Sequence, residues 1–224
     1  MTFSLTEEQP VPEWQARALG RSLAGARSRS IARLERFVGA ARDLANETES
    51  AAFTVAQVAE RAGLSLKSFY VCFAAKDDLL LALLEEDGGV GAAMLRRQVD
   101  AHDDPVDRVR AYFFGLFSLL TYPNALGYAG VLVREHRRLA EERPDDLRAA
   151  LTPLVGVLAD ELDAATRAGV AEIPHPQRDA ESVFGLLLTG VHEVTLKRSD
   201  PHDEAAHLWR LCWAGLRGPV DSEN

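Results

Sequence analysis

The chain has 224 residues, 47% of them hydrophobic, and a formal net charge of −9. This length suits one large or two modest domains. The net charge argues against a protein that binds nucleic acid over its whole surface. No apolar run approaches the roughly 20 residues that cross a bilayer. The first ten residues also lack the basic-then-apolar pattern of a signal peptide. We therefore expect no membrane partner and a cytoplasmic location.

The charge is distributed unevenly along the chain. Between Arg17 and Lys76 there are ten basic and five acidic residues, so that segment carries +5 and the remainder carries −14. Regions of opposite sign indicate that only the N-terminal part meets a polyanion such as DNA.

Helical periodicity recurs along the chain and predicts an all-α fold with two domains. Residues 1–27 lack this pattern, and we expect a flexible N-terminal arm there. Residues 28–88 are expected to form a first domain, with helices at 29–46, 54–63, 65–73 and from Lys76 to Asp87. Gly88, Gly89 and Gly91 then predict that the last helix is interrupted or bent. Residues 89–224 form the second domain, with helices expected at 105–120, 125–141, 145–168, 178–196 and 203–216.

The strongest local pattern covers residues 54–73 and predicts a helix-turn-helix. Thr54 and Gln57 have the spacing of a capping box, and Ser65 is a plausible N-cap of the next helix. Gly63 lies in the turn, where a positive φ costs little only for glycine. The start of the second helix is the part that enters the major groove in such motifs.

The segment TVAQVAERAGLSLKSFYVCFAAKDDLLLAL resembles the tetracycline-repressor (TetR) family of bacterial regulators. The resemblance implies phosphate contacts and a base-facing group at the recognition helix. Lys67 is the only long cation on that helix, which favours it as a guanine reader. Arg29 and the other arm arginines offer a second source of affinity through the adjacent minor groove. The implied phosphate contacts are Thr54, Tyr70 and Lys76, and the residues facing the bases or adjacent backbone are Ser65, Leu66, Lys67 and Ser68.

Two positions depart from the family pattern. Cys72 stands where the family often has His or Tyr, which removes one expected phosphate contact. Ala74 and Ala75 replace a frequent Pro-Ser pair, so the following helix loses a side-chain cap. Asp77 and Asp78 in its first turn are expected to compensate partly through the helix dipole.

The family resemblance also implies an effector cavity and a dimer in the second domain. Helices 178–196 and 203–216 would pair with their copies, and a two-fold dimer matches a palindromic operator. The aromatic residues of helix 105–120 favour an apolar or planar small-molecule ligand. The candidate effector contacts are Phe113, Phe114, Phe117, Tyr128, Arg134, His136 and His192.

The sequence carries two fragments of metal-binding motifs, and both are incomplete. His192-Glu193 is not HExxH, because Leu196 occupies the second histidine position, and Glu204-x-x-His207 has no second such pair. We therefore expect no catalytic residue, no metal and no cofactor. The sequence predicts a sequence-specific regulator, by family habit a repressor released from its operator by a small apolar or aromatic effector. The alternative is a helical dimeric ligand-binding protein that has lost DNA binding.

Overall fold

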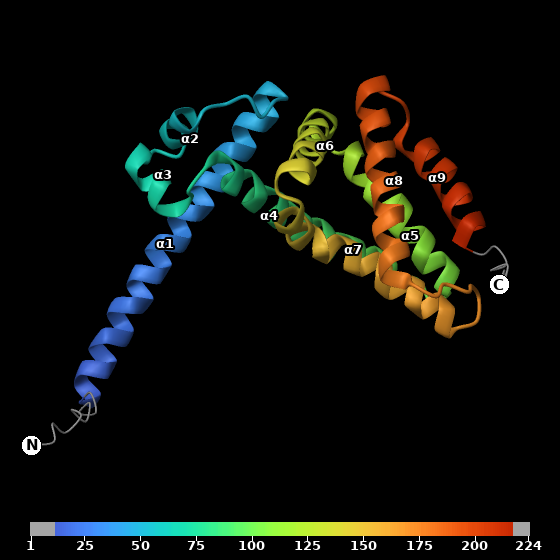
Figure 1. Cartoon of the computed structure of the whole chain (residues 1–224), viewed down its shortest axis with the longest axis horizontal. Helices are drawn as coiled ribbons and strands as arrows, with labels where there is room; N and C mark the ends of the chain where they lie inside the picture. Colours follow the sequence, from blue (N-terminus) through green and yellow to red (C-terminus); the bar gives the residue numbers. More distant parts are fainter. Residues whose placement is uncertain (1–11, 217–224) are drawn as a thin grey trace, which may run out of the picture.

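The structure is a computed structural model that describes residues 12–216, which contain helices and turns and no strand (Figure 1). This confirms the all-α prediction. The elements are α1 (Glu13–Thr48), α2 (Val55–Arg61), α3 (Leu66–Cys72), α4 (Lys76–Val99), α5 (Pro105–Ser118), the 3₁₀ turn η1 (Leu119–Thr121), α6 (Ala125–Glu142), α7 (Pro144–Arg167), α8 (Pro176–Lys197) and α9 (Pro201–Leu216).

The helices form a small N-terminal module and a larger C-terminal domain. Helices α2 and α3 pack against α1 and one another, and α4 leads from this module into the C-terminal domain (Figure 1). There α4 packs against α5 and α7, while α8 contacts α6, α7 and α9. The N-terminal module thus reaches the C-terminal helices mainly through one long helix, α4, with α6 touching α1 beside it.

The first helix begins much earlier than expected. The predicted irregular arm over residues 1–27 is wrong from Glu13 onward, because Glu13–Arg27 belongs to α1. This stretch is rich in alanine, arginine and leucine, which favour helix through intrinsic propensity rather than through an apolar face. Residues 1–11 of the expected arm lie outside the described residues.

The three glycines of α4 do not interrupt the helix, so the predicted interruption is wrong as well. A Cβ on Gly88 would stand 3.3 Å from the carbonyl oxygen of Ala150, and one on Gly91 would stand 3.3 Å from Leu154 Cδ2. These two glycines therefore let α4 approach α7 closely. The expected boundary between residues 88 and 89 falls inside one continuous helix.

Helix α5 lies in the interior, as its apolar circumference predicts. Tyr112, Phe113 and Phe117 are buried, and the Tyr112 hydroxyl donates a hydrogen bond to the Leu154 carbonyl oxygen at 3.0 Å. Between residues 12 and 216, no single helix is both long and apolar enough to cross a membrane. By length and composition alone, the segments 105–121 and 125–142 pass that test as a pair bent by 116°.

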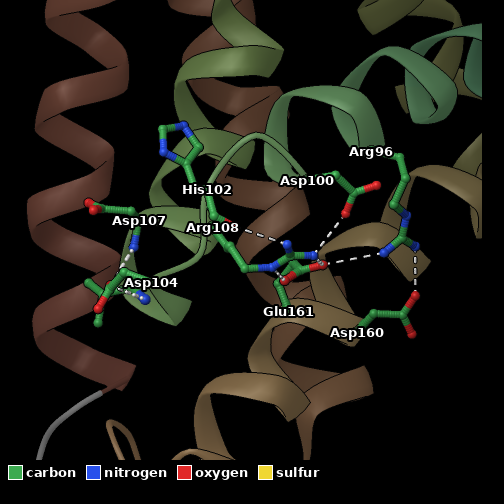
Figure 2. A network of polar contacts seen from close by, with 9 residues as sticks. Arg96, Asp100, His102, Asp104, Asp107, Arg108, Asp160 and Glu161 are labelled. Atoms are coloured by element: carbon green, nitrogen blue, oxygen red, sulfur yellow. Dashed lines mark hydrogen bonds and ion pairs between the residues drawn. The ribbon is translucent and has the colours of Figure 1, made fainter.

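A buried carboxylate joins the ends of three helices in the C-terminal domain (Figure 2). Glu161 of α7 is only 3% exposed. It accepts hydrogen bonds from Arg108 Nε at 2.7 Å and Nη2 at 3.0 Å, and from Arg96 Nη1 at 3.3 Å. Arg108 also donates to Asp100 at 3.0 Å, and Arg96 also donates to Asp160 at 2.6 Å. The hydrogen bond to Glu161 raises the pKa of Arg108, and this network fastens the end of α4 and the start of α5 to α7.

Candidate DNA interface and effector pocket

The helix-turn-helix has the local geometry that the sequence predicts. The Thr54 hydroxyl accepts a hydrogen bond from the Gln57 backbone at 3.2 Å, and the Gln57 side chain accepts one from the Thr54 backbone at 2.7 Å. Gly63 has φ +61° in the turn, and Ser65 caps α3 by accepting from the Ser68 backbone at 3.1 Å. The capping box, the glycine turn and the second N-cap are therefore confirmed.

Helix α3 turns one side inward and the other outward. Phe69 is fully buried, with its ring centroid 5.4 Å from that of Phe37 on α1. The outer side exposes Leu66, Lys67 and Tyr70, next to the N-cap of the helix. Leu66, Lys67 and Tyr70 thus share one accessible surface of α3, while Ser68, also expected to face DNA, is half-buried. Their individual contacts with DNA stay predictions.

Lys76 is held more tightly than the sequence suggested. Its ammonium group donates a hydrogen bond to the Ala51 carbonyl oxygen and lies 4.7 Å from the centroid of the Phe53 ring. Burial lowers the pKa of Lys76. The side chain therefore anchors the segment that leads to Thr54, and its phosphate contact stays a prediction.

Two arginines, one on α1 and one on α2, fix the motif to α1. Arg36 donates hydrogen bonds to the Ala62 and Gly63 carbonyl oxygens, the second at 3.2 Å. Arg61 of α2 pairs with Glu47 of α1 at 2.6 Å. Sequence analysis missed these roles, because the partners are separated by 14 to 27 residues and no local pattern marks them.

The start of α4 is capped and tied to the C-terminal domain. Asp78 compensates for Ala75 through a direct hydrogen bond, which its side chain accepts from the Ala75 backbone at 3.0 Å, whereas the sequence predicted an effect through the helix dipole. Asp77 and Asp78 also pair with Arg138 at 2.6 Å and Arg143 at 3.1 Å. The first turn of α4 therefore depends on helix α6 and on the residue that precedes α7.

An apolar cavity of about 210 Å³ lies within the C-terminal domain, between α4, α5, α6, α7 and α8. Its apolar walls include Leu84, Leu116, Leu132, Leu151, Phe184 and Val191. Of the residues expected to contact an effector, Tyr128 and His136 line this cavity. Burial lowers the pKa of His136, so its imidazole is neutral at pH 7.

The other five expected effector contacts lie elsewhere. Phe113 packs against Trp209 of α9 with ring centroids 5.5 Å apart, and Phe114 lies 5.0 Å from the ring of His202. Helix α5 is rotated so that these aromatic side chains face away from the cavity, which Leu116 and η1 line instead. The residues outside the lining are Phe113, Phe114, Phe117, Arg134 and His192. Arg134 instead donates to the Glu49 carbonyl oxygen at 2.7 Å.

A polar network joins the cavity wall to the N-terminal module. The Tyr128 hydroxyl donates to Asp87 Oδ2, while Arg42 of α1 donates to Asp87 Oδ1 through Nε at 3.1 Å and Nη2 at 2.8 Å. Burial, together with the Asp87 charge, raises the pKa of Tyr128 and keeps it protonated. Asp87 and Tyr128 line the cavity, so one carboxylate bridges α1, α4 and α6 at its edge.

Helices α8 and α9 lie side by side (Figure 1), and each exposes a large apolar side chain. Leu186 of α8 is 47% exposed and Leu211 of α9 is also exposed. A Cβ on Gly185 would meet no atom within 4 Å. Leu187 and Val191, by contrast, are buried inside the protomer. The expected interface helices thus present Gly185 and Leu186 outward, while Leu187 and Val191 belong to the core.

Comparisons with known proteins agree with this geometry. Residues 37–83 match the family model for bacterial regulatory proteins, tetR family. No curated protein matches the sequence significantly. The chain, which is 19% identical to FadR from Bacillus subtilis in complex with stearoyl-CoA, superimposes on it with a TM-score of 0.68, over 81% of this chain and 98% of FadR. Thermus thermophilus FadR in complex with lauroyl-CoA is 19% identical and superimposes with a TM-score of 0.66, over 85% of this chain and 98% of that FadR. RolR in complex with resorcinol is 21% identical and superimposes with a TM-score of 0.61, over 83% of this chain and 89% of RolR.

These findings define a helix-turn-helix module joined to an all-helical C-terminal domain. The chain combines a tetR-family N-terminal domain with the overall fold of tetR-family transcriptional regulators. This confirms the family resemblance inferred from the sequence.

Proposed function

We propose that the protein is a dimeric, sequence-specific DNA-binding regulator of the cytoplasm. By family habit it would be a repressor that a small effector releases from a palindromic operator. The observation that carries the proposal is the exposed outer side of α3, with Lys67 and Tyr70, on a module that α4 connects to an apolar cavity. Helix α4 would then connect the side chains that approach DNA to the cavity that accepts the effector.

The cavity favours an apolar or aromatic effector with few polar groups. Its lining is dominated by aliphatic side chains, and the Asp87 and Tyr128 oxygens already bind one another. Neutral His136 offers a donor or an acceptor to one polar group of a ligand. Fold relatives carry stearoyl-CoA, lauroyl-CoA and resorcinol, which have apolar chains or an aromatic ring. An effector of either kind would suit the same lining.

DNA recognition is tested by replacing Lys67. Lys67→Ala is expected to weaken binding to the operator by about 1–3 kcal/mol and to leave random DNA nearly unaffected, because a guanine contact carries sequence information. Tyr70→Phe should weaken both complexes alike, since phosphate contacts position the protein without reading bases. The measurement is fluorescence anisotropy on the upstream region of the gene and on a scrambled duplex.

Two outcomes of this titration would count against the proposal. If Lys67→Ala lowers both affinities equally, Lys67 contacts phosphate, and base reading must rest on Ser65, Leu66 and Ser68. If the native protein binds no duplex at low salt, the regulator proposal fails. A dimeric ligand-binding protein that has lost DNA binding then takes its place.

The dimer is tested at the outer face of α8. Leu186→Arg is expected to produce monomers at micromolar concentration, because a two-fold interface would bury two like charges near each other, at a cost of several kcal/mol. Leu66→Arg is the matched control, since Leu66 is 46% exposed but lies on α3. Analytical ultracentrifugation without DNA reports both. A native monomer, or a dimer that survives Leu186→Arg, would contradict this interface.

A further inference from the structure

Helix α1 extends far beyond the module that it supports (Figure 1). Arg36 donates hydrogen bonds to the helix-turn-helix turn, yet the helix begins at Glu13. At 1.5 Å per residue, the part from Glu13 to Arg33 is about 30 Å long. Nothing in the core requires this extension, because residues of α1 before Phe37 are exposed or half-buried wherever the structure describes their side chains.

The extension has an unusual charge for this protein. Between Trp14 and Leu34 there are five arginines and no acidic residue, in a chain with a net charge of −9. Arg21, Arg27 and Arg29 are exposed, and within residues 12–216 no carboxylate pairs with them. Elsewhere arginines such as Arg96 and Arg108 are bound by acids. The exposed guanidinium groups of Arg21, Arg27 and Arg29 are therefore available to an external anion, while the half-buried Arg33 donates one hydrogen bond to Ser30 Oγ at 3.2 Å.

The arginines of the extension do not all point the same way. Arg36 marks the side of α1 that faces the turn between α2 and α3. Arg33 and Arg29 precede it by three and seven residues, spacings that return to the same side of an α-helix. Arg27 precedes it by nine residues, about two and a half turns, and so lies on the opposite side. Arg29 and Arg33 thus continue the helix-turn-helix side of α1.

We propose that this side of the extension is a second DNA-binding surface, on which Arg29 and Arg33 contact backbone phosphates beyond the reach of α3. This inference rests on the proposed function and adds a footprint outside the base-reading helix. Guanidinium groups bind phosphate through paired N–H donors, so two such residues one turn apart follow a phosphate backbone without reading sequence. The acidic remainder of the chain stays away from the same polyanion.

DNA fits this surface better than other occupants do. A second copy or an anionic membrane would also bury the exposed apolar residues Leu23 and Ile31, which precede Arg36 by 13 and five residues and so lie away from its side of the helix. Arg29 and Arg33 instead share their side of α1 with the module whose outer helix exposes Lys67 and Tyr70. A DNA duplex bound at α3 would therefore lie on the same side of α1 as Arg29 and Arg33.

The test compares single charge removals in the full-length protein. Arg29→Gln and Arg33→Gln should each reduce the slope of log affinity against log salt by about 0.9 and weaken binding roughly eightfold at 0.1 M salt, because one counterion fewer is released. The loss should be equal on the operator and on a scrambled duplex. Arg27→Gln removes the same charge from the opposite side: if all the arm arginines entered the minor groove, it would weaken binding as much as Arg29→Gln, whereas a surface limited to the Arg29 side predicts a change in affinity of no more than about twofold.

The outcomes distinguish failure of the second DNA-binding surface from failure of the proposed DNA-binding function. If the native protein binds DNA and Arg27→Gln matches Arg29→Gln, the arginines act only through their general field, and the second surface is refuted. The same holds if Arg29→Gln abolishes binding to phosphatidylglycerol vesicles but leaves DNA binding intact. If the native protein binds no duplex, the proposed function fails with it. Circular dichroism confirms that each variant keeps its helical content.

Discussion

Replacing Glu161 with alanine is expected to lower the free energy of unfolding by about 2–3 kcal/mol, because Arg96 and Arg108, whose side chains are 38% and 24% exposed, lose their shared buried acceptor but keep Asp160 and Asp100. Glu161 is the buried acceptor of three hydrogen bonds from Arg96 and Arg108 (Figure 2). The loss should destabilise the contact of α7 with the end of α4 and the start of α5. Urea unfolding followed by circular dichroism measures the change.

Asp160 provides the matched control for this substitution. It neighbours Glu161 on α7 and pairs with Arg96 at 2.6 Å, but its side chain is 65% exposed. Asp160→Ala should therefore cost less than about 1 kcal/mol, as exposed ion pairs generally do. Equal losses for the two alanine variants would show that burial of the network contributes nothing to stability.

The second large effect is expected at the carboxylate that bridges α1, α4 and α6. Asp87→Ala removes the acceptor of hydrogen bonds from both Arg42 and Tyr128. Hydrogen bonds to charged groups contribute about 1.5–3 kcal/mol each. The side chains of Arg42 and Asp87 remain 28% and 22% exposed, so solvent screening limits the expected loss to about 2–3 kcal/mol in total.

Tyr128→Phe isolates the regulatory consequence of the same network. Phenylalanine keeps the apolar wall of the cavity but removes the hydroxyl that reaches Asp87, so ligand binding should persist while its effect on DNA affinity falls. Allosteric couplings usually correspond to factors of about 5–150, and we expect most of that factor to be lost. DNA affinity is measured with and without saturating lauroyl-CoA or resorcinol, using whichever ligand lowers it in the native protein.

Tyr112→Phe controls for the loss of one buried tyrosine hydroxyl. Tyr112 donates to the Leu154 carbonyl oxygen of α7, and among the described residues its hydroxyl has no hydrogen bond to α1. This variant should lose about 1 kcal/mol of stability and keep the full coupling. A Tyr128→Phe protein that responds to ligand as strongly as the native one would exclude Asp87 as the link between cavity and DNA module.

The sequence was sufficient where the interaction is local. Thr54 with Gln57, Gly63 in the turn and Ser65 at the next N-cap all act within four residues, so their spacing alone predicts the helix-turn-helix. Most helix boundaries in the C-terminal domain follow equally from proline and glycine positions. The early part of α1 escaped detection because helix propensity without an apolar stripe leaves no periodic signal.

Only the tertiary structure decided which buried faces meet. Periodicity marks Phe113 and Phe117 as buried, but the rotation of α5 sends them away from the cavity and turns Leu116 toward it. The same applies to the glycines of α4 that face α7, and to the α8 face that exposes Leu186 rather than Leu187. Arg42, Asp87 and Tyr128 lie 45 and 41 residues apart along the chain. Capping and turn geometry depend on neighbours in sequence, whereas a cavity depends on how separate helices pack, which no single helix encodes.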